Sequence, residues 1–136
     1  MMLVSYRPRG SESAWQAGVM RDKAVVGANG FVATDGRSSS SARELLPQLD
    51  ELCAWAGQQF DRGDGVLALD TVELGAPIPD PDKILCLGVN YREHAAETQL
   101  EVSAVPVLFA KFRNSLIVPT SPILLPPPQV STHIDY

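Results

Sequence analysis

The sequence predicts a mostly β protein with short helices, of the α+β class, in which a small amino-terminal α/β-type domain precedes the first strands of a second domain. Three observations support this fold class. Short β-branched and aromatic runs alternate with turns in the first third of the chain, one amphipathic helical pattern follows, and an unbroken apolar run begins at Ile84. Because this later run is more apolar than the early strands, a second core is expected.

The first third of the chain contains three candidate strands, at Met2 to Tyr6, Ala14 to Met20 and Lys23 to Gly30. The stretch RPRGSES breaks the first run, and glycines end the third. These runs predict a small antiparallel sheet. The polar tract Thr34 to Ser41 is expected to be a loop.

An amphipathic helix is predicted after this loop, because Leu45, Leu49, Leu52 and Ala56 recur at steps of four, three and four. Pro47 lacks a backbone donor and clashes with the preceding turn. We therefore expect a short turn over residues 41–46 and a main helix with Pro47 in its first turn, packed as a lid on the small sheet.

The stretch DRGDG is expected to end this helix, and Val66 to Leu74 reads as one strand. The next segment, GAPIPDPDK, holds three prolines in nine residues. It predicts a domain boundary: a small domain over residues 1–75, a proline-rich linker over 76–82, and a second domain over 83–136, of which the chain carries only the beginning.

The second domain is predicted to start with Ile84 to Val89, a strand buried on both faces. A short helix, YREHAAET, and a strand over Val105 to Phe112 follow. The proline-rich tail after Phe112 excludes a long helix and favours extended edge segments.

Composition excludes several functional classes. Apolar residues make up 45% of the chain, and its net charge is −5 without a basic cluster, which argues against nucleic acid as a partner. No apolar stretch has the length of a signal peptide or a membrane span, so neither a membrane partner nor secretion is expected, and the default location is the cytoplasm. Cys53 and Cys86 are interpreted as small buried hydrophobes, because neither has a partner at metal-ligand spacing.

Two residues in the predicted helix can carry chemistry. His94 and Glu97 lie three apart and share a helix face, and a carboxylate beside an imidazole fixes its tautomer and raises its basicity. The pair suits a general base. Taken alone, such a pair more often decorates the surface of a helix.

The residues around this pair resemble the fumarylacetoacetate hydrolase family. Lys83 to Glu97 reads KILCLGVNYREHAAE, which is similar to the family pattern K-I-[IVL]-C-[VL]-G-x-N-Y-x-x-H-x-x-E, and Pro106 to Lys111 matches P-x-[LM]-F-x-K. The proline-containing stretch Val118 to Gln129 also fits. The resemblance covers residues 83–136, and it implies that the catalytic domain is a mixed β-roll.

The resemblance implies a metal-dependent enzyme acting on 2-oxo acids or 1,3-diketo acids, as a C–C bond hydrolase, an oxo-acid decarboxylase or an isomerase or hydratase, as in the breakdown of aromatic compounds. It implies that His94 is the general base, that Glu97 is its partner, and that Tyr91 and Lys111 bind substrate. The implied cofactor is Mg²⁺ or Ca²⁺.

The family holds its metal through a motif resembling D-Y-E-x-E-L, and the chain stops at Asp135 and Tyr136. We therefore expect no metal site, no bound cofactor and no activity in this chain alone, which would make it a truncated enzyme. The substitutes weighed are Asp80 with Asp82, Glu97 with Glu101, and His133 with Asp135, and none has enough oxygen ligands for Mg²⁺.

An alternative function is a non-catalytic interaction module. The apolar strand and the proline-rich tail would then pair with another chain, because unpaired apolar strands invite association. With either function, we expect a homodimer or an association with another chain.

Overall fold

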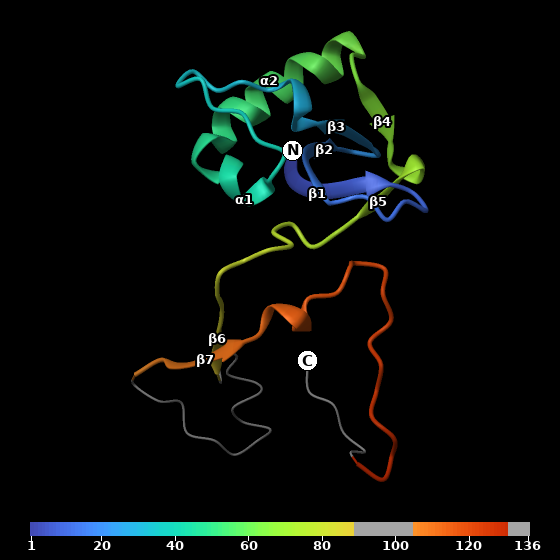
Figure 1. Ribbon diagram of the computed structural model, residues 1–136, viewed down its shortest axis with the longest axis vertical. Helices are drawn as coiled ribbons and strands as arrows, with labels where there is room; N and C mark the ends of the chain where they lie inside the picture. The colour runs from blue at the N-terminus through green and yellow to red at the C-terminus, as the bar shows by residue number, and fades with distance from the viewer. Residues whose placement is uncertain (89–104, 131–136) are drawn as a thin grey trace.

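The computed structural model describes residues 1–88 and 105–130 of the 136-residue chain. Its strands are β1 (Met2–Pro8), β2 (Gln16–Arg21), β3 (Ala24–Gly27), β4 (Val66–Ala68), β5 (Val72–Leu74), β6 (Ile84–Gly88) and β7 (Val107–Lys111). Its α-helices are α1 (Ala42–Leu45) and α2 (Leu49–Arg62), and short 3-10 turns are η1 (Ala28–Gly30), η2 (Leu46–Gln48), η3 (Leu69–Thr71) and η4 (Arg113–Ser115). The predicted class, α+β and mostly β with short helices, is confirmed (Figure 1).

A five-stranded sheet in the order β4-β3-β2-β1-β5 forms the small domain, and all its neighbours are antiparallel. The three strands predicted in the first third are its centre. The two-residue turn between β2 and β3 places Asp22 at φ 55°, a left-handed conformation that Asp tolerates better than most residues. The predicted antiparallel sheet is therefore confirmed.

The prediction of a single strand over residues 66–74 is wrong. This stretch forms β4 and β5 at opposite edges of the sheet, joined only by η3. In a flat sheet the edges of five strands would lie about 19 Å apart, at about 4.8 Å per strand spacing. Three residues in a 3-10 turn advance only roughly 6 Å, so the sheet must curl until its edges approach each other.

Hydrogen bonds to both sides of the sheet hold η3 in this position. The amide of Leu69 donates to the carbonyl of Lys23 at 2.9 Å, and the amide of Arg9 donates to the carbonyl of Thr71 at 3.0 Å. The Arg9 side chain adds bonds from Nε to the Asp70 carbonyl at 2.6 Å and from Nη2 to the Val72 carbonyl at 2.8 Å. Residues 69–71 therefore leave the strand ladder, because their backbone groups bond to Lys23 and Arg9 instead of to a neighbouring strand.

The helical region divides into three pieces around Pro47. The prediction placed Pro47 in the first turn of the main helix, but it lies in η2, and α2 begins two residues later at Leu49. The proline ring blocks a continuous α-helical ladder with the preceding turn, so the chain bends between α1 and α2. Gly63, at φ 77°, ends α2 in the left-handed conformation typical of a helix C-cap, as the DRGDG stretch predicted.

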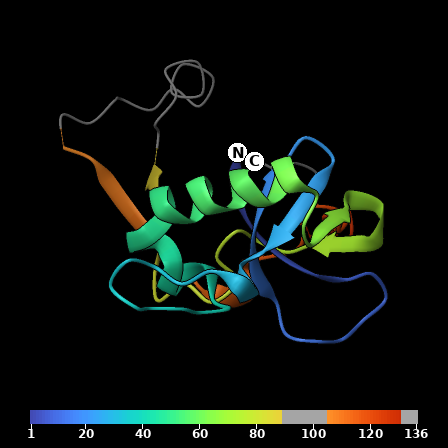
Figure 2. The same ribbon diagram turned by 90° about the horizontal axis from the view of Figure 1, so that it is seen from above.

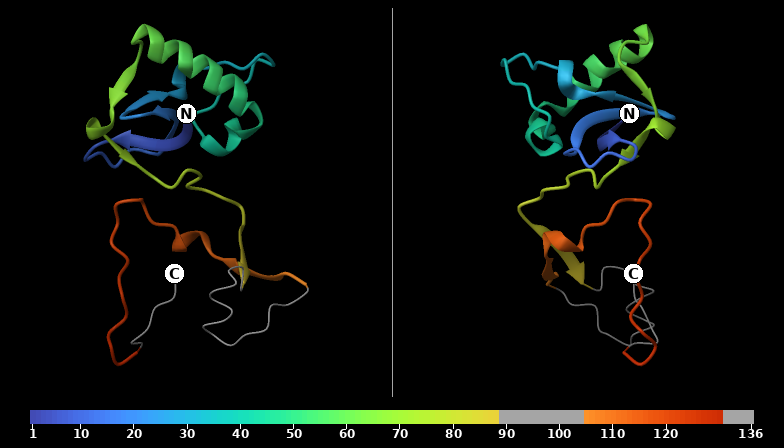
Figure 3. Two further views of the ribbon diagram at one scale, coloured as in Figure 1. Left: turned by 180° about the vertical axis from the view of Figure 1, so that it is seen from behind. Right: turned by 45° about the vertical axis from the view of Figure 1, so that its right-hand side comes forward.

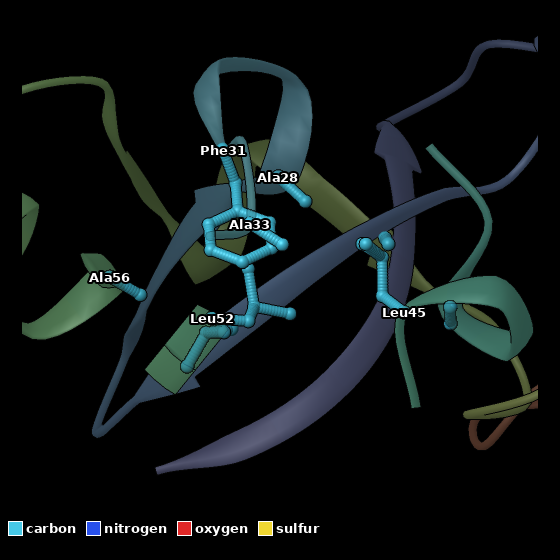
Figure 4. Close-up of a cluster of buried hydrophobic side chains, with 9 residues drawn as sticks. Ala28, Phe31, Ala33, Leu45, Leu52 and Ala56 are labelled. Atoms are coloured by element: carbon cyan, nitrogen blue, oxygen red, sulfur yellow. The ribbon is translucent and has the colours of Figure 1, made fainter. Parts of the chain in front are cut away.

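One face of the sheet packs under the helices. Leu52 and Ala56 of α2 and Leu45 of α1 are almost fully buried against Ala17 and Val19 of β2. Figure 4 shows Phe31 and Ala33 in the same cluster as Leu52, Ala56 and Leu45. The Phe31 ring also contacts Trp55, at a ring-centroid distance of 5.8 Å. The predicted role of the helix as a lid on the sheet is confirmed (Figure 2).

The opposite, concave face has its own small core of Val4, Tyr6, Val25 and Val72. Val25 of β3 and Val72 of β5 share this cluster although β2 and β1 lie between their strands, which the curl of the sheet explains. The Tyr6 ring lies over two glycines: a Cβ on Gly18 would lie 3.0 Å from this ring, and a Cβ on Gly27 would overlap the Tyr6 hydroxyl.

The proline-rich segment after β5 is docked on the small domain. The amide of Gly75 donates to the Ser5 carbonyl at 2.8 Å, and the Ser5 hydroxyl donates to the Pro77 carbonyl at 2.9 Å. Farther along, Arg43 of α1 pairs with Asp82 at 2.7 Å and with Asp80 at 3.5 Å. The path from β5 to β6 is thus held at both of its ends.

β6 and β7 form a separate two-stranded antiparallel sheet below the small domain in Figure 1, and both views of Figure 3 show the same separation. The expectation that the strand beginning at Ile84 is buried on both faces is wrong: Leu85 is 65% and Leu87 45% exposed. Only one strand pairs with β6 in the described part of the chain, and no second layer there covers its leucines.

The remaining expectations for this region have mixed outcomes. The strand predicted over 105–112 is confirmed as β7, whereas the helix predicted over YREHAAET lies in 89–104, outside the described residues. Residues 116–130 contain no helix, as expected, but they also join no strand ladder. Across residues 1–88 and 105–130, no helix has the length and apolarity needed to cross a membrane.

Two glycine substitutions, one beside Tyr6 and one inside α2, are predicted to have opposite effects on stability. Gly27→Ala should lower the free energy of unfolding by about 1–3 kcal/mol, because the new methyl group overlaps the Tyr6 hydroxyl. Gly57→Ala, inside α2 and 3.6 Å from the nearest side-chain atom, should raise it by about 0.5–1 kcal/mol through helix propensity. Urea unfolding followed by tryptophan fluorescence measures both; equal effects of the two variants would contradict the packing argument.

The Arg7–Glu73 pair predicts a pH dependence of stability. Glu73 accepts a hydrogen bond from Arg7 Nε at 3.0 Å and one from the Gly10 amide at 3.2 Å, and these lower the pKa of Glu73 below its ordinary value of 4.5. A carboxyl whose pKa is depressed by folding stabilises the fold above its unfolded pKa, and this stabilisation is lost as the pH falls through the folded pKa.

Thermal unfolding between pH 7 and pH 3 should therefore show a decline below about pH 4.5 that is shallower in Glu73→Gln. Glu12→Gln is a matched control, because this exposed carboxylate makes no ion pair within the described residues. A Glu73→Gln profile parallel to the wild type would refute the assignment.

Candidate functional site

The β6–β7 ladder brings the two sequence motifs together. Its register pairs Ile84 with Lys111, Cys86 with Phe109 and Gly88 with Val107. The KILCLG run therefore lies beside the PVLFAK run along their full length. Because Gly88 and Val107 are partners, the two ends of the segment that joins the motifs leave the ladder at the same point.

That joining segment carries three of the four predicted site residues. Tyr91, His94 and Glu97 lie in 89–104, outside the described residues, so their roles stay predictions. The described strands fix both ends of the segment, because Gly88 and Val107 are paired in a ladder of defined register. This is how functional loops are commonly positioned by a rigid scaffold.

Lys111, the fourth predicted site residue, lies at the opposite end of the ladder. Its partner is Ile84, four positions from Gly88, which corresponds to about 13 Å along a strand. The side chain is exposed, forms no ion pair within the described residues, and shares a face with Cys86 and Phe109. The structure thus presents a free ammonium group but does not bring it to the point where the His94 segment leaves the sheet.

Two cavities lie where the later part of the chain approaches the small domain. One, of about 380 Å³, is lined in part by Trp15, Ser40, Ser41, Asp80 and Arg113. The other, of about 350 Å³, lies between β5 residues with Arg9 and the turn at Val118 to Thr120. Among the residues that the structure describes, neither cavity is lined by a histidine or by a cluster of carboxylates.

Sequence reasoning missed Arg113 as a cavity residue. The sequence feature that could have indicated it is its position two residues after Lys111, just past the second motif. There the chain turns through η4 towards the small domain. The contribution of Trp15 and Ser41 had no sequence signal, because it depends on how residues far apart in the chain approach.

The described carboxylates do not make a divalent metal site. No group of three His, Cys, Asp or Glu side chains that could hold a metal occurs in residues 1–88 and 105–130. Asp80 and Asp82, weighed from the sequence as substitute ligands, are both engaged by Arg43. The other two pairs weighed, Glu97 with Glu101 and His133 with Asp135, lie outside the described residues.

Shifted pKa values in the described chain mark the small domain rather than a catalytic centre. Burial raises the pKa of Tyr6, and hydrogen bonds from the amide and hydroxyl of Thr34 lower the pKa of Glu51. Both groups hold loops or strands together. Cys53 and Cys86 are free thiols and are only half-buried, less than the sequence suggested.

Comparisons with known proteins agree with the motifs. The family model for the fumarylacetoacetate (FAA) hydrolase C-terminal domain matches residues 83–136. Oxaloacetate tautomerase fahd2, mitochondrial, from Xenopus laevis is 33% identical over 94 residues, which is 69% of this chain and 29% of the relative. The fumarylacetoacetate hydrolase domain-containing protein 2 homolog from Dictyostelium discoideum is 28% identical over 137 residues, or 98% of this chain and 43% of the relative.

A third relative is more similar over a shorter stretch. Oxaloacetate tautomerase Fahd2a, mitochondrial, from Rattus norvegicus is 42% identical over 52 residues, 38% of this chain and 17% of the relative. The chain spans less than half the length of each of these relatives. The region that the family model matches, residues 83–136, contains both motifs of the β6–β7 ladder, and the chain belongs to the fumarylacetoacetate hydrolase family.

Proposed function

We propose that this chain provides the small domain and the first catalytic-domain strands of an enzyme that tautomerises a small 2-oxo acid, with oxaloacetate as the preferred substrate class. The observation that carries the proposal is the β6–β7 ladder, which sets the two family motifs in register around the His94 segment. Tautomerisation is proposed over C–C bond hydrolysis and decarboxylation because similar proteins from Xenopus and rat carry the name oxaloacetate tautomerase.

The proposed chemistry is a proton transfer next to a carbonyl group. His94 takes a proton from the carbon beside the 2-oxo group, and the same proton is delivered to the carbonyl oxygen, which gives the enol without loss or gain of atoms. Glu97 accepts the other imidazole N–H and holds the required tautomer. Tyr91 and Lys111 are proposed to bind the substrate's carboxylate or its developing enolate oxygen.

A divalent cation is part of what the family resemblance implies, and it would supply Lewis-acid polarisation of the carbonyl when bound. The described residues do not offer a ligand set for it, so none of the steps above is assigned to a metal. For this reason we also propose that residues 1–136 do not turn over substrate by themselves.

The test is a comparison of the chain with a fusion. Residues 1–136, joined to the part of the Xenopus relative that follows its matched region, should accelerate the enol-to-keto conversion of oxaloacetate, followed by ultraviolet absorbance. The unfused chain with Mg²⁺ should remain at the background rate. His94→Gln in the fusion should lower kcat by about 10²–10⁴-fold, the usual contribution of a general base.

Glu12→Gln, on the surface of the small domain, is the control and should keep full activity. Full activity of the His94→Gln fusion would remove His94 from the proposal. Stoichiometric Mg²⁺ binding and turnover by the unfused chain would overturn the claim that these residues are insufficient.

A second candidate function is association with another chain without catalysis. The observation that favours it is the exposure of both strands of the β6–β7 sheet, together with apolar side chains along residues 112–130. Exposed apolar surface of this kind commonly marks a protein interface. If this is the function, the chain should bind its partner chain with the same Kd after His94→Gln.

A further inference from the structure

One cavity lies between the small domain and the chain that follows β7. Its volume is about 380 Å³, within the roughly 300–1,000 Å³ of small-molecule sites. From the small domain it is lined by Ser5 of β1, Trp15, Ser40 and Ser41, and from the later chain by Asp80 of the proline-rich segment and Arg113 of η4. None of these residues takes part in the proposed proton transfer.

The cavity holds two opposite charges that do not pair with each other. Among the described residues, the Arg113 guanidinium forms no ion pair and donates no side-chain hydrogen bond. Asp80 has one cationic partner, Arg43, at 3.5 Å, and Arg43 makes its closer contact with Asp82, at 2.7 Å. Because a carboxylate offers about four acceptor sites, Asp80 keeps lone pairs for a further donor.

The serines of the lining divide in the same way into donors and acceptors. The hydroxyl groups of Ser40 and Ser41 bond to no other described residue, so each can donate to an anion. The Ser5 hydroxyl is almost fully buried and already donates to a backbone carbonyl, so only its acceptor lone pairs remain. A ligand here therefore needs an acceptor group near Arg113 and a donor group near Asp80.

Trp15 supplies an apolar wall that the fold holds in place. A Cβ on Gly75 would lie 2.9 Å from the indole ring, and the Arg7 guanidinium lies 4.4 Å from the ring centroid. Arg7 is itself held by Glu73 at 3.0 Å. Because these contacts order the ring beforehand, a ligand that packs against it loses little affinity to side-chain ordering.

We propose that this cavity binds a free amino acid with an aliphatic side chain. Its carboxylate accepts hydrogen bonds from Arg113, whose planar guanidinium matches a carboxylate in geometry, and its ammonium group donates to Asp80. Its aliphatic part packs on Trp15. A zwitterion of this kind bridges two charges that the fold leaves apart, which a simple anion or a simple cation cannot do.

This site is a further property of the chain and does not rest on the proposed enolisation. Binding is measured without turnover, so the two proposals succeed or fail separately. The lining also predicts an order of affinity: a carboxylate without a neighbouring donor group approaches Asp80 with nothing to offset the repulsion between the two negative charges.

The test is an NMR titration of the whole ¹⁵N-labelled chain with three acids of one carbon skeleton: leucine, 2-hydroxy-4-methylpentanoate and 4-methylpentanoate. The indole N–H resonance of Trp15 reports binding, and Trp15→Phe identifies that resonance. Leucine should have the lowest Kd, the hydroxy acid a higher one, and 4-methylpentanoate the highest.

Two variants of the lining test the assigned contacts. Arg113→Gln should raise the Kd of leucine at least about tenfold, because a charge-assisted hydrogen bond is lost. Asp80→Asn should also raise it and should remove the preference for leucine over the hydroxy acid. Asp82→Asn is a matched control, because it removes the closer Arg43 contact from outside the lining. Arg62→Gln, at the end of α2, controls for the loss of a positive charge, and both controls should keep the wild-type Kd.

The Trp55 indole resonance reports whether each variant is folded, because Trp55 packs against Phe31 in the core of the small domain. The proposal is overturned if leucine produces no saturable shift of the Trp15 resonance, or if the three acids bind equally. Tightest binding of the hydroxy acid, or a folded Arg113→Gln variant with the wild-type Kd for leucine, would also overturn it.

Discussion

The constraint on which the small domain depends is the three-residue crossing between its edge strands. Because η3 connects β4 to β5 directly, the five strands cannot lie flat, and the curl creates an inner face and an outer face. Tyr6 fills the inner face over two glycines, and α2 covers the outer face through Leu52 and Ala56. Arg9 matters to this arrangement because its guanidinium donates to the carbonyl of Asp70 within the crossing and to the carbonyl of Val72 at the start of β5.

The second part of the chain has the opposite character. It carries the family motifs, yet its described residues bury no apolar side chain. A small domain that folds on its own core thus precedes strands that require further contacts. The docking of the proline-rich segment through Ser5 and Arg43 means that these strands start from a fixed point on the small domain rather than from a loose tether.

The sequence predicted the local elements well where periodicity or turn residues dominate. The early strands, the lid helix and the glycine that ends it follow from side-chain alternation, the leucine spacing and the left-handed preference of glycine. The break at Leu69 to Thr71 was not predictable in this way, because its cause is a set of bonds to Lys23 and Arg9, which are distant in sequence. Pro47 was correctly identified as a helix breaker but placed one turn too far into the helix.

The candidate site shows a similar division. The closely spaced motif residues around Ile84 to Gly88 identified the family. The burial of that strand was overestimated, because an apolar run shows that a strand favours burial but does not show which part of the chain covers it. The approach of Arg113 to Trp15 was invisible to pattern reasoning because it depends on the path of the chain between separate elements.

The pairing of Gly88 with Val107 also determines how the chain between β6 and β7 begins and ends. The ladder fixes both ends of the eighteen intervening residues at neighbouring positions, so the strands already bring the ends of this segment together. The entropic cost of closure rises by only about 0.6 kcal/mol for each doubling of loop length. The strands therefore hold both ends of this segment in register at a closure cost that depends only weakly on the number of residues between them.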